Sequence, residues 1–291
     1  MENSDINETL FAEAVEAIDN GNVNALQRLL KANPNLTTKR LDTPTEKAYF
    51  SNPYLLWFVA DNPIRHGKLP PNIIEVTQTI IKSLKDNLHD NYQNQLDYTL
   101  ELVSTGRITK ECKVQIPLME LIINEGAKVK GSVLGSIGEH NFEAAKYLLT
   151  KGADNNLATA VGLDEFEDIK NLATNATASE LYVALVVASF FGKIEMISFL
   201  IKAGANLNGQ GKPEDFGGFH SHASPLHQAV SSGSLEAVKL LVEEGANLNA
   251  TDKIYNGTPL SWAMHLLRVE NDKKKYFKEI ENYLSDKQSK L

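Results

Sequence analysis

SPLHQAVSSGSLEAVKLLVEEGANLNA, residues 224–250, is the stretch that decides the fold of this 291-residue chain. Ser224 suits a helix N-cap, and Pro225 suits the first helical position, where no amide donor is needed. Gly233 and Gly245 stand where two helices should end, because glycine adopts a left-handed conformation at little cost. The stretch therefore predicts one complete helix–turn–helix unit.

The second predicted helix of this unit carries a single apolar face. Its apolar residues recur at helical spacing, and they are Leu235, Val238, Leu241 and Val242. In the first helix, Ala229 is small enough for a neighbouring helix to approach closely. The pattern favours a stack of small units over a domain with a central pocket, and so favours binding over catalysis.

The unit resembles the ankyrin repeat, whose T-P-L-H-x-A signature recurs about every 33 residues. Ser224 replaces the usual threonine, and the matching residues are Pro225, Leu226, His227 and Ala229. Residues 257–260, Gly-Thr-Pro-Leu, open the next unit with the same pattern. The resemblance implies an all-α, ankyrin-repeat α-solenoid of about seven to eight helix–turn–helix repeats with a degenerate N-terminal third.

Residues 219–262 also resemble a group of bacterial stand-alone ankyrin-repeat proteins with a G-F-H-x-H-x-x-P-L-H-Q-A motif. The matching residues are Gly218, Phe219, His220, His222, Pro225, Leu226, His227, Gln228 and Ala229. This resemblance implies a solenoid and no assigned biochemical role.

Helix-ending residues recur at a fixed offset along the chain. The offset of twelve between Gly233 and Gly245 reappears around apolar helical faces at Gly192 and Gly204, His140 and Gly152, Val114 and Gly126, and Gly21 and Asn33. Asn33 is expected to take the place of glycine at its helix end. Further helix pairs are expected at 157–162 with 166–172 and, in degenerate form, at 54–60 with 73–81.

These units divide the chain into four predicted segments. They are an N-terminal capping repeat at 1–36, degenerate repeats with long connections at 37–110, core ankyrin repeats at 111–257, and a C-terminal capping repeat at 258–291. In the last segment we expect five side chains to face inward, namely Leu266, Phe277, Ile280, Tyr283 and Leu284. The final residues, 285–291, are expected to fray.

Composition excludes several classes of function. The formal net charge of −8 disfavours binding to a phosphate backbone, so no nucleic-acid partner is expected. No apolar run reaches 18 residues, so we expect no membrane partner. No secretory signal is visible, so we do not expect secretion. Cys112 is the single cysteine, so no disulfide can form within the chain and a reducing cytoplasm is the expected setting. We also expect a monomer without cofactors.

The junction at residues 209–227 is longer than the others among the core repeats, and it is rich in glycine and histidine. One interpretation is a surface loop that folds back on the stack, with His227 supplying the hydrogen bond usual in this repeat. The alternative is a metal or small-molecule sensor. His220 and His222 would point to the same side of an extended chain, and Asp215 or Glu214 could be a third ligand.

A partner-binding surface is the sharper hypothesis for this region. The loop and the next finger, residues 251–256, are expected to project side by side and to form an apolar patch. The candidate partner-binding residues are Phe216, Phe219, His220, His222, Gln228, Ile254 and Tyr255. The alternative for Phe216 and Phe219 is that they tuck under their own loop and pin it.

No catalytic pattern competes with binding. Ser221, Ser224 and His227 are close in sequence but lack an oxyanion-forming Gly-x-Ser-x-Gly elbow, and Lys212 is not part of a phosphate-binding loop. We therefore expect a non-enzymatic protein–protein interaction module, acting as a scaffold, adaptor or inhibitor. It would bind a protein partner through its finger loops and concave face.

Overall fold

The computed structural model describes residues 8–41, 52–60, 67–87, 90–129, 132–209, 216–217 and 219–290. These residues form helices, turns and loops, and none of them lies in a strand. The chain divides into two compact units, Met1–Ala153 and Asp154–Leu291. The predicted all-α class is confirmed, while the division into capping, degenerate and core segments stays a prediction.

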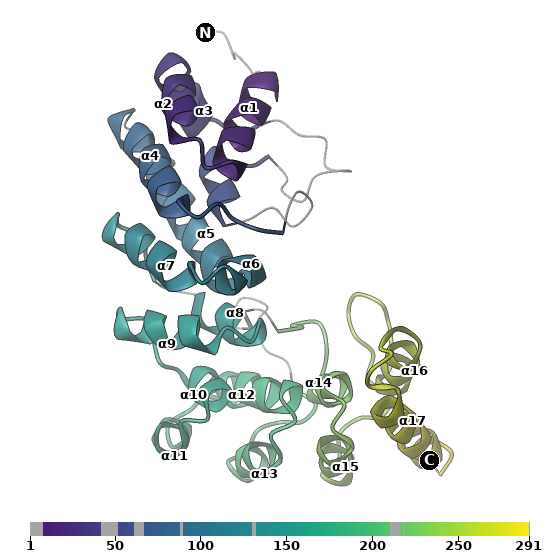
Figure 1. The fold of residues 1–291 in the computed structure, drawn as a ribbon. Helices are drawn as coiled ribbons and strands as arrows, with labels where there is room; N and C mark the ends of the chain where they lie inside the picture. Colours follow the sequence, from purple (N-terminus) through teal and green to yellow (C-terminus); the bar gives the residue numbers. More distant parts are fainter. Residues whose placement is uncertain are drawn as a thin grey trace. The chain divides into compact units, whose positions relative to one another are not determined.

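The first unit contains helices α1 to α9 and the 3-10 helix η1 (Figure 1). Their bounds are α1 Glu8–Asp19, α2 Val23–Ala32, α3 Asn35–Thr38, η1 Leu55–Val59, α4 Ile73–Asp86, α5 Tyr92–Thr105, α6 Arg107–Glu111, α7 Gln115–Asn124, α8 Ser132–Gly138 and α9 Phe142–Thr150. The packed pairs are α1 with α2, η1 with α4, α5 with α7, and α8 with α9. The expected degenerate pair is present, whereas no sequence pattern indicated α5.

The second unit contains helices α10 to α17 and repeats one arrangement. Their bounds are α10 Leu157–Leu163, α11 Phe166–Ala173, α12 Ala178–Phe190, α13 Ile194–Lys202, α14 Pro225–Ser232, α15 Leu235–Glu243, α16 Pro259–Val269 and α17 Lys274–Gln288. Each even-numbered helix packs against the helix that follows it, and α10, α12, α14 and α16 also pack in succession (Figure 1). This succession is the stacking of first helices that the repeat pattern predicts.

Left-handed residues end the helices where the sequence predicted them. Positive φ angles occur at Gly21, Gly126, His140, Gly152, Gly192, Gly204, Gly233 and Gly245. Two expected positions differ. The left-handed residue before α7 is Lys113 and not Val114, and Asn33 has a φ of −135°. Asn33 follows α2 without a left-handed turn because its backbone and side-chain amides both donate to the carbonyl oxygen of Leu29.

The cores of the units are apolar, as the helical spacing predicts. On α15, Val238 and Leu241 are fully buried, while Leu235 and Val242 are half-buried. On α12, every residue from 181 to 189 is buried, because this helix packs against α10, α13 and α14. Burying one large aliphatic side chain contributes about 1.5–3 kcal/mol, so these contacts fix how the helices stack.

The C-terminal pair agrees with the prediction for its core. Phe277, Ile280 and Leu284 are buried, and Leu266 and Tyr283 are half-buried. The expected fraying from residue 285 is wrong, because α17 continues to Gln288. The Gln288 side chain donates hydrogen bonds to the carbonyl oxygen of Leu248 and to Asn249 Oδ1, both at 3.2 Å, and these bonds hold the last turn.

Candidate functional site

A short finger, residues 251–257, joins α15 to α16 and is built around one carboxylate. Asp252 Oδ1 accepts hydrogen bonds from the backbone amides of Ile254 (2.9 Å) and Tyr255 (2.7 Å), and Oδ2 accepts one from Gly257 (2.9 Å). The Asp252 amide donates to the Gly257 carbonyl oxygen at 2.9 Å and closes the finger at its base. Aspartate stabilises such turns because its carboxylate reaches backbone amides a few residues ahead.

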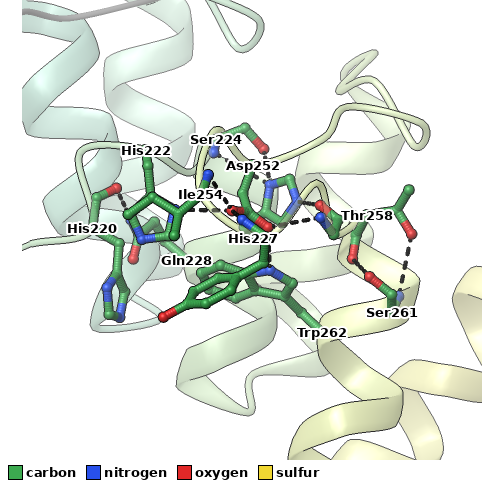
Figure 2. Close-up of polar contacts among 12 residues, drawn as sticks. His220, His222, Ser224, His227, Gln228, Asp252, Ile254, Thr258, Ser261 and Trp262 are labelled. Carbon is green, nitrogen blue, oxygen red and sulfur yellow. Dashed lines mark hydrogen bonds and ion pairs between the residues drawn. The ribbon is translucent and has the colours of Figure 1, made fainter.

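Asp252 also ties the finger to its surroundings. The Trp262 indole on α16 donates to Oδ2 at 3.0 Å, and His222 Nδ1 lies 3.2 Å from Oδ1 (Figure 2). Burial alone would raise the pKa of the Asp252 carboxyl, but the bonds donated by Tyr255, Trp262, Ile254 and Gly257 outweigh burial and hold that pKa well below its usual range. The carboxylate is therefore ionised, and every partner it needs is in place.

His227 on α14 holds the base of the finger through a hydrogen bond. Its Nε2 donates to the Gly257 carbonyl oxygen at 2.9 Å, and its Nδ1 accepts from the Ser224 amide (3.3 Å) and hydroxyl (2.7 Å). Burial lowers the pKa of His227, which favours the neutral ring that this bonding pattern requires. The expected structural hydrogen bond of this histidine is confirmed.

Aromatic rings fill the space between the finger, α16 and the loop before α14. The Trp262 ring centroid lies 5.0 Å from that of His227, 5.7 Å from that of His220 and 5.9 Å from that of His222. The Tyr255 ring meets His222 at 6.0 Å. These spacings are typical of edge-on and tilted ring packing, so the finger rests on a packed aromatic base.

Three of the predicted partner-binding residues are buried. Phe216 is 1% exposed and packs on Tyr182, and Phe219 is 4% exposed and packs on Phe190 and Phe191. Gln228 is fully buried, and its side-chain amide donates to the His220 carbonyl oxygen at 3.0 Å. The expectation that Phe216 and Phe219 contribute to an exposed apolar patch is wrong. The two phenylalanines pin the loop to the stack, which was the alternative.

The remaining candidates form what we call the finger surface, namely His220, His222, Ile254 and Tyr255. Ile254 is 61% exposed and Tyr255 is 76% exposed, both at the apex of the finger. His220 is exposed beside them, and His222 is half-buried. The Lys253 amide donates to the His222 carbonyl oxygen at 3.0 Å, so the backbone itself joins the loop to the finger.

A metal at the two histidines receives no support from this geometry. His222 Nδ1 faces Asp252, whose oxygens already accept the bonds described above. The proposed third ligands, Glu214 and Asp215, lie outside the described residues. Among the residues that are described, no group of three or more histidine, cysteine, aspartate or glutamate side chains could hold a metal ion.

Sequence reasoning did not identify Asp252 and Trp262, which organise the finger. The sequence holds a partial signal for Asp252. It lies five residues before Gly257, which precedes the Thr-Pro start of the next helix, and an aspartate at the start of such a turn often accepts hydrogen bonds from the turn amides. The contact of the Trp262 indole with that carboxylate has no such signal.

The comparisons with known proteins agree with this architecture. A family model described as ankyrin repeats (3 copies) matches residues 118–252 and, in an overlapping match, 185–270. No curated protein matches the chain. The two matches together cover just over half of the sequence and contain α14, the finger and α16. The chain therefore belongs to the ankyrin-repeat family, and its fold is the all-α ankyrin-repeat solenoid.

Proposed function

We propose that this chain is a non-enzymatic scaffold, adaptor or inhibitor that binds a protein partner through its finger surface and the neighbouring concave faces of its first helices. Ankyrin repeats are in general protein–protein interaction modules. The observation that carries the proposal is the finger apex, where Ile254 and Tyr255 are largely exposed above a fixed backbone.

The fixed backbone favours binding on energetic grounds. Ordering a loop on association costs free energy, which offsets part of the favourable interaction with the partner. In this finger, Asp252 has already satisfied the apex amides and Gly257, so little ordering remains to be done. Tyrosine is among the residues that dominate the binding energy of protein interfaces, and here Tyr255 stands on a fixed backbone beside the exposed Ile254.

The one serine–histidine contact at the site supports binding over catalysis. The Ser224 hydroxyl donates to His227, but the imidazole is completely buried and its other nitrogen donates to a backbone carbonyl. A substrate cannot reach this ring. We interpret the contact as part of the helix start and not as an activated nucleophile.

We also propose that the protein acts as a cytoplasmic monomer. Its single cysteine suits a reducing compartment, since no disulfide can form within the chain. In the described part of the chain, no helix has the length and apolar character needed to cross a bilayer. The acidic net charge disfavours a nucleic-acid partner.

Site-specific photo-crosslinking tests the binding proposal. A benzophenone amino acid is placed at Tyr255 or, as a matched control, at Tyr276, which is 55% exposed at the start of α17. Both proteins are irradiated in native cell extract. We expect a discrete adduct with one partner from position 255 and none from position 276. An adduct from position 276 alone, or none from position 255, would contradict the proposed site.

A further inference from the structure

The charge around the finger surface differs from that of the whole chain. The protein has 37 acidic and 29 basic residues, yet residues 216–235 contain no charged residue. The charged residues in the range 251–269 are Asp252, Lys253 and Arg268. Asp252 is buried and bonded, whereas Lys253 and Arg268 are exposed. The described residues of the loop, α14, the finger and α16 therefore expose two cations and no carboxylate.

The two cations stand near the two ends of the segment that runs from the finger through α16. On α16, Ser261, His265 and Arg268 are three or four residues apart, which places them on one helical face, and all three are exposed. This face begins at the finger, because a Cβ added to Gly257 would lie 3.0 Å from Ser261 Oγ. We call Lys253 and Arg268, together with the α16 face between them, the cationic strip.

The length of α16 suits a short extended segment. α16 has 11 residues, which corresponds to a length of about 16 Å. An extended peptide of about five residues spans the same distance. A chain lying along α16 could thus contact the finger apex with one side chain and Arg268 with another.

We propose that the finger surface and the cationic strip together bind an acidic peptide segment that carries a large apolar side chain. This inference rests on the proposed function. The apolar side chain packs on Ile254 and Tyr255, and carboxylates pair with Lys253 and Arg268. Arginine binds carboxylates in a bidentate manner, which fixes the orientation of the segment as well as its charge.

A nucleic acid fits the same surface less well. Two cations neutralise few phosphates, and Ile254 offers no stacking platform for a base. Exposed acidic residues also resume directly after α16, at Glu270 and Asp272. The repulsion from these carboxylates limits an anionic polymer more than it limits a peptide of about five residues.

Peptide selection against the full chain tests the proposal. Random 12-residue peptides are selected for binding, and their affinities are measured for the wild type, for K253E/R268E and for K202E/K239E. The last pair makes the same change in net charge at exposed positions of α13 and α15, outside the finger and α16. We expect the selected peptides to be rich in Asp, Glu and large apolar residues, to bind K253E/R268E at least about tenfold more weakly, and to bind the control as they bind the wild type.

Other outcomes would overturn the proposal. They are selection of neutral or basic peptides, failure to enrich any peptide, equal affinity of acidic peptides for K253E/R268E, or tighter binding of a labelled single-stranded oligonucleotide. The R268E change also places a negative charge at the C-terminal end of a helix, which can destabilise the helix. The neutral variant K253Q/R268Q is therefore measured as well, and it should weaken binding of the acidic peptides less than K253E/R268E does.

A second comparison separates this inference from the proposed function. The crosslinked partner is tested against I254A/Y255A and against K253E/R268E. Loss of binding in both variants supports both ideas. Loss in I254A/Y255A alone leaves the finger as the binding element and overturns the acidic-segment inference, and no loss in either variant overturns both.

Discussion

Replacing Asp252 with asparagine should destabilise the C-terminal unit, although the substitution changes almost no volume. In the native protein, Oδ1 accepts from the amides of Ile254 and Tyr255, and Oδ2 accepts from Gly257 and the Trp262 indole. An asparagine side chain has one oxygen and one NH2 group. Whichever way it rotates, its NH2 group faces two donors, so two hydrogen bonds are replaced by donor–donor contacts.

The magnitude follows from those two bonds. A hydrogen bond to a charged group contributes about 1.5–3 kcal/mol, and part of the loss is recovered when the finger relaxes towards water. We expect the D252N variant to lose about 2–4 kcal/mol of the free energy of unfolding. Because His222 also loses its ionised neighbour, the aromatic base of the finger should loosen as well.

Urea denaturation and amide hydrogen exchange together measure this effect. The amides of Ile254, Tyr255 and Gly257 should exchange much faster in D252N than in the wild type. Asp272, exposed in the connection between α16 and α17, provides the control, and D272N should differ little from the wild type. A D252N protein within about 0.5 kcal/mol of the wild type, with unchanged exchange at the three amides, would refute the reasoning.

The same carboxylate predicts a dependence on acid pH. The pKa of Asp252 is lowered in the folded protein, so its contribution is fully present above the unfolded value of about 3.9 and is lost as the pH falls further. The wild type should therefore lose more unfolding free energy than D252N when the pH is lowered below about 4. Parallel curves for the two proteins would show that the native carboxylate is not preferentially ionised.

Three further predictions concern the same unit. Burial lowers the pKa of His227, so the free energy of unfolding should fall as the pH drops below about 6.5. The fall should be less steep in H227Q, and an equal dependence on pH in the two proteins, measured by urea denaturation, would contradict this. Lys193 donates to the carbonyl oxygens of Val161 and Gly162 at 2.9 Å each. The K193M variant should therefore lose about 1–3 kcal/mol of the free energy of unfolding, measured by urea denaturation. A negligible loss would contradict a role of Lys193 in ending α10. Gly233 has a φ of 80°, and a Cβ there would make only ordinary contacts, at 3.8 Å, with Tyr276 and Phe277. G233A should therefore cost about 1–2 kcal/mol from the backbone alone, and a stabilised variant would refute that.

The regular part of the fold could be predicted from the sequence because each repeat marks its own ends. Gly192, Gly204, Gly233 and Gly245 all adopt the left-handed conformation that their spacing implied. Thr258 begins α16 as an N-cap, and its hydroxyl accepts from the Ser261 amide. Local chemistry of this kind needs no knowledge of distant residues.

Helix α5 could not be predicted because its buried face is partly polar. Gln95 and Thr99 lie fully buried on that face. The Gln95 amide donates to the carbonyl oxygen of Thr37, and the Thr99 hydroxyl donates to that of Gln95. These polar residues interrupt the apolar periodicity that identifies a helix, and the partner at Thr37 is distant in sequence.

The site was predicted in part for a similar reason. Exposure of Ile254 and Tyr255 follows from their place at a turn apex, which is a local property. The burial of Phe219 depends on packing against Phe190 and Phe191, across a loop whose length alone does not show where it folds. The hydrogen bond from Trp262 to Asp252 likewise depends on how α16 is oriented.

The binding of the crosslinked partner to I254A/Y255A tests the central claim most directly. The matched control is V269A/Y276A, which removes one aliphatic and one aromatic side chain of comparable exposure from the region where α16 ends and α17 begins. Removing both finger side chains should weaken binding by at least about a hundredfold, while both variants keep the stability of the wild type. Equal affinity of the two variants, or weaker binding by V269A/Y276A, would contradict the finger surface as the binding element.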